Sequence, residues 1–158
     1  MRKRIINQDL QGAIGDGQSW LDLQKLAQVE LTSEETDHPI EAALMILGDG
    51  LGWRAAQPGE QTIRLLFDEL QNIKRIQLLF QEDRHTRTQE FVLLWLSESD
   101  QSWRELVRQQ YHFSPPDTER EFEDYTVGLV GVSALELRIV PDISCGDVYA
   151  SLVQLRIA

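Results

Sequence analysis

The stretch FVLLWLSESDQSW, residues 91–103, decides the fold. Its first six positions are all apolar, a pattern typical of a β-strand that is covered on both faces. The polar break at residues 98–100 then ends this strand with residue types that favour a turn. No apolar run approaches the roughly 18 residues that a membrane helix needs, so we expect no membrane segment.

Shorter stretches on either side of this segment predict further strands. Apolar and polar residues alternate in them, which places one face of each strand toward a core. They are residues 29–32, 62–67, 76–80, 135–139 and 153–157. Turn residues separate them and no long amphipathic helix lies between them. This arrangement indicates an all-β fold, an antiparallel β-sandwich or barrel.

The beginning of the chain has a weaker pattern. Residues 1–19 are polar and contain three glycines, so we expect a flexible or irregular N-terminal arm. Residues 20–26 fit a short helix behind Ser19, and they also fit a strand. The predicted β-sandwich domain therefore spans residues 20–158.

The composition favours a single cytoplasmic domain. A chain of 158 residues has the size of one domain, and 42% hydrophobic residues are enough for a core. The basic start MRKRII is followed at once by polar residues 7–9, which leaves no apolar region for a signal peptide. The single cysteine, Cys145, cannot form an internal disulfide, in keeping with an intracellular protein.

The order of these features resembles the discoidin family, also called the coagulation-factor C-domain or galactose-binding-like family. The resemblance rests on AQVELTS at 27–33, on Asp49-Gly50 followed by Trp53, on TIRLLFD at 62–68 and on the 91–103 stretch. Residues 135–140 and 152–157 resemble the closing pair of strands. The resemblance covers roughly residues 20–158 and implies a jelly-roll sandwich whose loops at one end bind carbohydrate. The cysteines of the terminal disulfide in secreted members are missing here.

A shorter stretch, residues 53–63, resembles the N-terminal domain of the animal single-strand-break repair scaffold protein, which has the same general fold. That resemblance implies an alternative function as a protein–protein interaction or assembly module. A sheet face or an edge strand would then be the contact surface.

No set of residues indicates catalysis, so we expect a binding module and no enzyme. The histidines, His38, His85 and His112, lack the spacing of metal ligands. No nucleophile, phosphate-binding or dinucleotide-binding motif occurs, and Cys145 lies in no nucleophile signature. His112 would line a pocket or lie half-buried in a loop.

The glycine-rich segment before Trp53 is the first candidate for a binding site. Asp49, with Glu41 and nearby loop carbonyls, would offer oxygen ligands to Ca²⁺, or Asp49 would simply accept hydrogen bonds within a turn. Trp53 would stack on a sugar ring or, as we favour, fill one end of the sandwich.

A second candidate is the polar break that contains Asp83, Arg84, His85 and Arg87. These side chains would grip a carboxylate, a phosphate or a sugar hydroxyl. The alternative is that they form the solvated tip of a hairpin.

We place the ligand site at the loop end that contains Asp49 and Arg54, joined by Asp142 or Asp147. If Trp53 points inward on an extended segment, Arg54 points outward. The alternative for Arg54 is a simple ion pair with a neighbouring carboxylate.

The charge predicts that the protein does not bind nucleic acid strongly. The formal net charge is −11, and no dense stripe of lysine and arginine is present to neutralise phosphates. We expect no submicromolar binding to nicked duplex DNA at physiological salt in a fluorescence anisotropy titration. Tight binding that weakens steeply with added salt would contradict this expectation.

Overall fold

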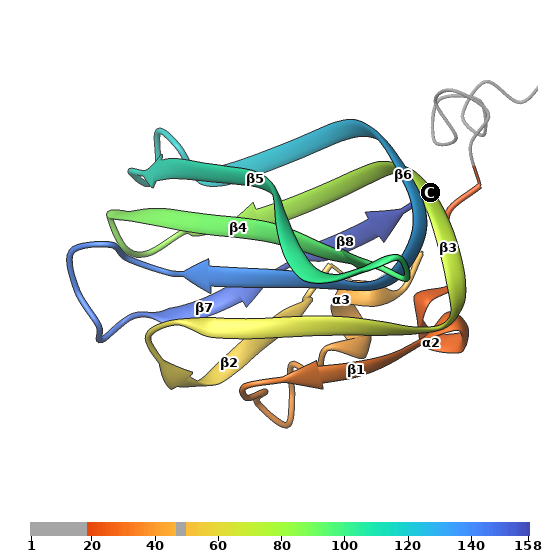
Figure 1. Ribbon diagram of the computed structural model, residues 1–158. Coiled ribbons are helices and arrows are strands. Elements are labelled where there is room, and N and C mark those ends of the chain that lie inside the picture. Colours follow the sequence, from red (N-terminus) through yellow and green to blue (C-terminus); the bar gives the residue numbers. More distant parts are fainter. Residues whose placement is uncertain (1–18, 47–49) are drawn as a thin grey trace, which may run out of the picture.

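The computed structural model describes residues 19–46 and 50–158, which form an antiparallel β-sandwich (Figure 1). The prediction of an all-β sandwich is therefore confirmed. The described elements are α2 (Leu23–Leu26), β1 (Ala27–Leu31), α3 (Glu41–Leu44), β2 (Trp53–Pro58), β3 (Gln61–Gln81), β4 (Arg87–Ser97), β5 (Asp100–Phe113), β6 (Arg120–Val140), β7 (Tyr149–Leu152) and β8 (Gln154–Ile157). None of the helices in this part of the chain is long and apolar enough to cross a membrane.

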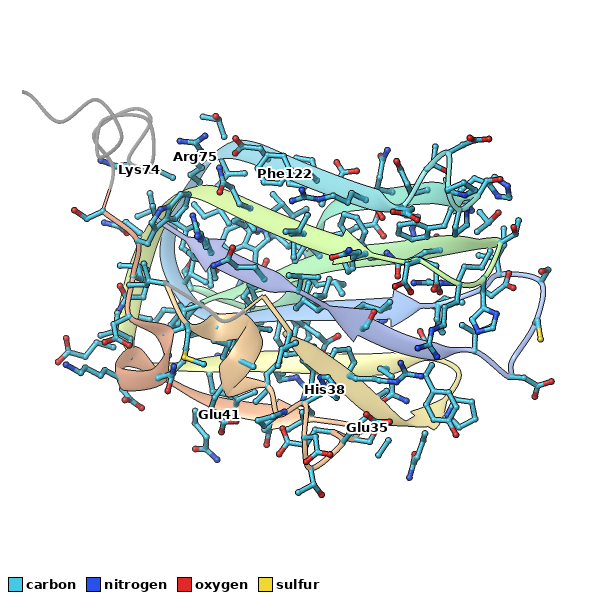
Figure 2. All side chains as sticks on the ribbon, turned by 180° about the vertical axis from the view of Figure 1, so that it is seen from behind. Glu35, His38, Glu41, Lys74, Arg75 and Phe122 are labelled. Atoms are coloured by element: carbon cyan, nitrogen blue, oxygen red, sulfur yellow. The ribbon has the colours of Figure 1, made fainter. Side chains whose placement is uncertain are left out.

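Two strands of 21 residues each, β3 and β6, run through both layers of the sandwich. The first half of β3 pairs with β1 and with the second half of β6, while its second half pairs with β8 and with the first half of β6. Figure 1 shows both strands turning together near the C-terminus and passing from one layer to the other. Figure 2 shows Lys74 and Arg75 at this end, where β3 has entered the second layer.

The bend has a local cause in both strands. The register between β3 and β6 shifts repeatedly between Leu66 and Arg75, and such bulges bend a strand. On β6, Gly131 has a φ of +66°, which glycine adopts without steric strain. Its N–H donates to Oδ1 of Asn72 on β3 at 3.1 Å. The prediction of two separate strands at 62–67 and 76–80 is thus wrong, because one bent strand contains both.

The sheet order places β4 between β6 and β5, so that β4 is an interior strand. Phe91, Val92 and Leu93 are buried, so the prediction of a strand covered on both faces is confirmed for the first half of the apolar run at 91–96. It is wrong for the second half, residues 94–96, which are only half-buried. The β4–β5 hairpin closes at the pair Ser97 and Asp100, also as predicted. The core between the layers includes the rings of Phe80 and Phe91, whose centroids lie 5.3 Å apart.

Other expectations need correction. Strand β5 continues to Phe113, so His112 lies on a strand and is exposed, with Nδ1 2.8 Å from the Thr88 hydroxyl. Of the two alternatives for residues 20–26, the helix is found, but only over Leu23–Leu26 and with Asp22 as the N-cap. The expectation for residues 1–19 falls, except for Ser19, outside the described residues.

Trp53 begins β2 and is 1% exposed, and its indole Nε1 donates to the carbonyl of Ser33 at 3.0 Å. Directly before it, Gly52 has a φ of +69°, and a Cβ there would collide with the Leu152 carbonyl on β7. The ribbon of β2 and β7 can therefore close over Trp53 only because position 52 is glycine. The interpretation of Trp53 as a structural residue is confirmed.

We predict that Trp53→Ala destabilises the fold by about 3–5 kcal/mol, because truncating a buried tryptophan leaves a large cavity. It also removes the hydrogen bond to Ser33. Chemical denaturation should show the loss as a lower midpoint. Trp103→Ala, at a half-buried position on β5, is the control and should lower the midpoint much less. A Trp53→Ala protein of unchanged stability would refute the structural role.

Candidate functional site

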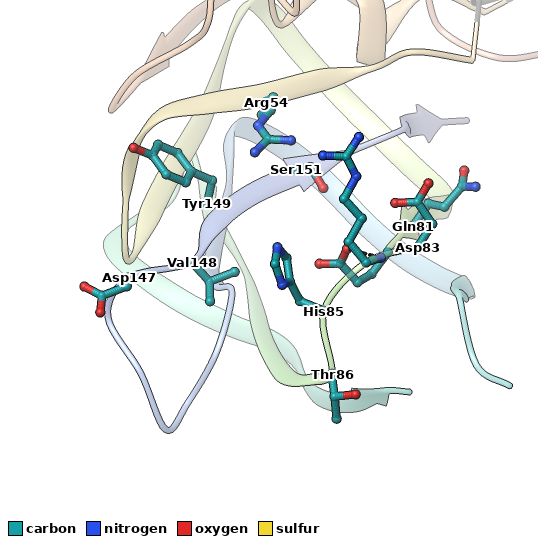
Figure 3. Close-up of a pocket in the computed structure, with 11 residues that line it drawn as sticks. Arg54, Gln81, Asp83, His85, Thr86, Asp147, Val148, Tyr149 and Ser151 are labelled. Carbon is teal, nitrogen blue, oxygen red and sulfur yellow. Dashed lines mark hydrogen bonds between the residues drawn. The ribbon is translucent and has the colours of Figure 1, made fainter. Parts of the chain in front are cut away.

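An open hollow of about 660 Å³ lies where the loop between β3 and β4 faces β2 and β7. We call it the loop hollow. One wall is formed by residues 81–86, and the other by Arg54, residues 147–149 and Ser151. Figure 3 shows His85 rising from the 82–86 loop toward Arg54 and Ser151. Most of the side chains around it are polar or charged.

The β2–β7 wall combines an arginine with an exposed aromatic ring. Arg54 lies opposite Ser151 in the strand register, and its guanidinium lies 5.6 Å from the centroid of the Tyr149 ring. The Tyr149 side chain is 39% exposed. Arg54 Nε also lies 3.4 Å from Glu35 Oε1, in an ion pair between two partly exposed side chains. Such a pair contributes little to stability and leaves Arg54 accessible to a ligand.

The opposite wall is held in shape by Glu82. Its Oε1 accepts from Arg87 Nε at 2.7 Å, and its Oε2 accepts from the backbone N–H of Arg84 at 3.0 Å. Burial acts to raise the pKa of Glu82, but the bonds from Arg87 and from the backbone keep that pKa below its usual range. The loop is thus anchored from behind, while Asp83 and His85 project exposed side chains.

The structure corrects the interpretation of this loop as a hairpin tip. Strands β3 and β4 do not pair with each other, because the loop connects a strand of one layer to a strand of the other. The expectation that Arg87 binds a ligand is also wrong. It is buried, and its Nη1 donates to the Pro141 carbonyl at 2.7 Å. Asp83, Arg84 and His85 do line the loop hollow.

The four residues predicted for the site have different outcomes. Arg54 and Asp147 line the loop hollow, and Arg54 points outward as expected from the inward Trp53. Asp142 does not line it, because its Oδ1 accepts from the backbone N–H and the hydroxyl of Ser144 at 3.0 and 2.8 Å. Burial acts to raise the pKa of Asp142, but these bonds keep that pKa below its usual range. Asp49 lies outside the described residues.

The fold brings together two groups that the sequence keeps apart. Arg54 and Asp147 belong to the first predicted site, and residues 83–85 belong to the second. Tyr149 and Ser151 were missed. A signal for them exists, because Ala150 and Leu152 are apolar and alternate with them. That alternation predicts an outward direction for Tyr149 and Ser151.

The calcium site stays a prediction. Among residues 19–46 and 50–158, no three His, Cys, Asp or Glu side chains lie close enough to hold a metal ion. Glu41 lies in the first turn of α3, and Asp49 falls in the undescribed segment.

Next to the loop hollow, a smaller one of about 300 Å³ shares Arg54, Asp83 and Ser151 with it and reaches His38. The Nδ1 of His38 is buried and has no hydrogen-bond partner in the described part of the chain. This nitrogen is therefore a further polar group near the loop hollow.

Behind the wall of the loop hollow that residues 81–86 form, polar side chains are buried in the sandwich. Arg87 Nη1 donates to Gln89 Oε1 at 3.2 Å, and Gln89 Nε2 donates to Glu121 Oε1 at 3.0 Å. Burial, followed by the neighbouring Glu123 carboxylate, raises the pKa of Glu121 to about 8. The hydroxyl of Tyr125 donates to Glu123 Oε2 at 2.8 Å. Burial and the Glu123 carboxylate therefore favour the protonated form of Glu121.

No family model matches the sequence, and no curated protein matches it either. Solved structures nevertheless share the fold. The family 32 carbohydrate-binding module of NanJ from Clostridium perfringens, in complex with galactose, has a TM-score of 0.64 at 10% identity, with 87% of this chain and 96% of that chain covered.

Two further structures are similar to a comparable degree. A pectin-binding carbohydrate-binding module has a TM-score of 0.58 at 17% identity, with 84% of this chain and 89% of that chain covered. A chain from the structure of reduced XRCC1 bound to the catalytic domain of DNA polymerase β has a TM-score of 0.57 at 15% identity, with 84% and 95% covered. At such low identity the likeness establishes the fold, and it confirms the predicted jelly-roll sandwich.

The buried Glu121 predicts a pH-dependent stability. Its folded-state pKa of about 8 lies above the ordinary value of 4.5, so the folded protein keeps a proton that the unfolded chain releases in this range. The contribution of this group is fully present below pH 4.5 and is lost as the pH rises toward 8. We expect Glu121→Gln, which cannot ionise and can keep the hydrogen bond from Gln89 Nε2, to raise the melting temperature relative to wild type more at pH 8 than at pH 5.

Glu98→Gln is the matched control, because Glu98 is exposed on the β4–β5 turn and should give no such difference. An equal effect of Glu121→Gln at both pH values would show that Glu121 is not a protonated buried carboxyl.

Proposed function

We propose that the protein is a non-catalytic binding module that recognises carbohydrate in the loop hollow. The observation that carries the proposal is the exposed ring of Tyr149, which lies in the hollow together with Arg54, Asp83, His85 and Ser151. This combination matches the chemistry of a sugar, which presents an apolar C–H face and a set of hydroxyl groups.

The two walls have complementary roles in this proposal. The Tyr149 ring offers an apolar face on which the C–H side of a pyranose can lie. Arg54 donates hydrogen bonds, the Asp83 carboxylate accepts them, and the Ser151 hydroxyl does both. The walls are fixed by strand pairing on one side and by the bond between Glu82 and Arg87 on the other. A polar site held in this way needs little ordering when a ligand binds.

The solved structures of the same fold support the ligand class. Two of the three described above are carbohydrate-binding modules, one in complex with galactose and one binding pectin. Since their identity to this chain is low, the choice of carbohydrate here rests on the side chains of the hollow and not on a shared set of residues.

Glu82 and Glu121, the two carboxyl groups at the loop hollow and behind it whose pKa is shifted, do not form a glycosidase pair. Such enzymes need one protonated carboxyl group and one ionised carboxylate on either side of the scissile bond. Glu82 is ionised and bonded to Arg87, while Glu121, whose pKa is raised, is 1% exposed and out of reach of a ligand.

Titration of the ¹⁵N-labelled protein with galactose, N-acetylgalactosamine, mannose and galacturonate, each with and without Ca²⁺, tests the proposal by NMR. We expect shifts at Arg54, His85 and Tyr149 with at least one sugar. Tyr149→Ala and Arg54→Gln should each weaken that binding about tenfold, equal to 1.4 kcal/mol, because each removes one main contact.

The controls replace similar residues elsewhere. Phe122→Ala removes another exposed aromatic ring, and Arg104→Gln removes another exposed arginine that lies over a ring, that of Trp95. Both should bind sugar as the wild type does. No shift with any of the sugars, or shifts confined to a sheet face, would contradict a carbohydrate site in the loop hollow.

A further inference from the structure

Most arginines in the described residues have an acidic partner. Ten arginines fall in this part of the chain, and seven of them lie within 4.0 Å of a carboxylate oxygen. The three without such a pair are Arg84, Arg120 and Arg156. Arg84 lines the loop hollow. Arg120 and Arg156 have no acidic partner among the described residues, although the chain has 26 acidic residues. They therefore offer positive charge to an anionic group of a ligand.

Arg120 and Arg156 lie on the outward side of the second layer. We call the surface formed by the outward residues of β8, β3 and β6 the outer face. In the strand register Arg156 pairs with Gln77, Leu79 pairs with Phe122, and Gln81 pairs with Arg120. A shallow hollow of about 180 Å³ lies among them. Figure 2 shows Phe122 at the surface, on the same side of the molecule as Arg75.

The centre of the outer face is apolar. Phe122 is 58% exposed, although phenylalanine is among the residue types most often buried. It lies beside Leu79 and between the two arginines. An apolar ring flanked by unpaired cations fits a ligand with an apolar centre and anionic ends.

The surroundings of Arg156 add an energetic reason. Its guanidinium lies 5.7 Å from the Trp20 ring centroid, and its Nη2 donates to the carbonyl of Ile46 at 3.1 Å. Its Nε is buried without a partner in the described residues. Burial lowers the pKa of Arg156, which means that its charge is partly desolvated. A carboxylate placed beside it would offset that cost.

We propose that the outer face binds an acidic, extended segment of a partner protein, with an apolar side chain on Phe122 and carboxylates near Arg120 and Arg156. Gln77 and Gln81, which pair with these arginines, are four residues apart on β3, or roughly 13 Å at 3.3 Å per residue. Arg156 on β8 and Arg120 on β6 also lie on opposite sides of β3, two strand spacings or roughly 9.6 Å apart across the sheet, which puts their Cα atoms roughly 16 Å apart. In an extended segment the two acidic residues are then about four to five positions apart, with the apolar residue between them.

The same observations argue against a nucleic acid as the ligand. A strand of phosphates would approach a protein with a net charge of −11, and only two unpaired arginines on the outer face would neutralise it. The two arginines balance the two carboxylates of the proposed segment, whereas a longer run of phosphates would leave further charges facing the exposed Asp124 carboxylate on the same face.

A defined peptide tests the proposal on the full chain. The probe is acetyl-Ser-Asp-Ser-Leu-Ser-Asp-Ser-amide, and its control has asparagine in place of both aspartates. In NMR titrations we expect the acidic peptide to shift the side-chain Nε–Hε signals of Arg120 and Arg156 and the amide of Phe122. Arg120→Gln and Phe122→Ser, both at exposed positions, should each weaken binding at least fivefold.

The controls separate this site from the loop hollow. Arg104→Gln and Tyr149→Ala should leave peptide binding unchanged, whereas Tyr149→Ala weakens sugar binding. No shift at millimolar peptide, equal binding of the asparagine peptide, or full binding by Phe122→Ser would overturn the proposal. Tighter binding of an oligothymidylate, lost in Arg120→Gln, would overturn it in favour of nucleic acid. None of these results affects the proposal for the loop hollow.

Discussion

The long antiparallel pairing of β3 and β6 is the constraint on which the rest of the structure depends. Because both strands bend at the same place, one hydrogen-bonded pair supplies the centre of both layers. Every other strand of the sandwich except the β2–β7 ribbon then adds to β3 or β6, directly or through β4. The inward side chains of the two halves of β3, such as Ile63 and Leu78, consequently meet in one core. A change that straightened the bend would separate the two layers.

The same pairing determines where binding residues can lie. The second half of β3 contributes inward residues to the core, outward residues to the outer face, and its last residue, Gln81, to the loop hollow. The chain then crosses to β4 through a loop fixed by the bond between Glu82 and Arg87. The β2–β7 ribbon completes the hollow from the other side, because Val153 N–H donates to the Leu79 carbonyl at 2.9 Å and joins the ribbon to β3.

The sequence predicts the fold class because period-two alternation is a local property. The strands at 29–32, 91–96 and 135–139 could be read in this way, and so could the inward direction of Trp53. The bend could not be predicted, because residues 68–72 are polar except for Leu70 and look like a loop between two strands, although the chain continues as one strand through them. The candidate site was predicted only in pieces for a similar reason. Arg54, Asp147 and His85 are far apart in sequence, and only the crossing of the chain between layers brings them together. Arg87 is bonded to Glu82 in the same loop, but its burial also involves the Pro141 carbonyl, which is far away in the sequence and could not be foreseen from it.

The position of β5 at the end of the sheet order has a consequence for solubility. An outermost strand offers unpaired backbone groups to which another chain can add, and this is a common start of aggregation. Along β5 the exposed side chains include Arg104, Glu105 and Arg108, all of them in ion pairs, and the register with β4 shifts beside them. A strand from another molecule would have to desolvate these charges and follow an irregular edge. The protein thus protects the place where non-specific assembly would begin, and this leaves recognition to its loops and sheet faces.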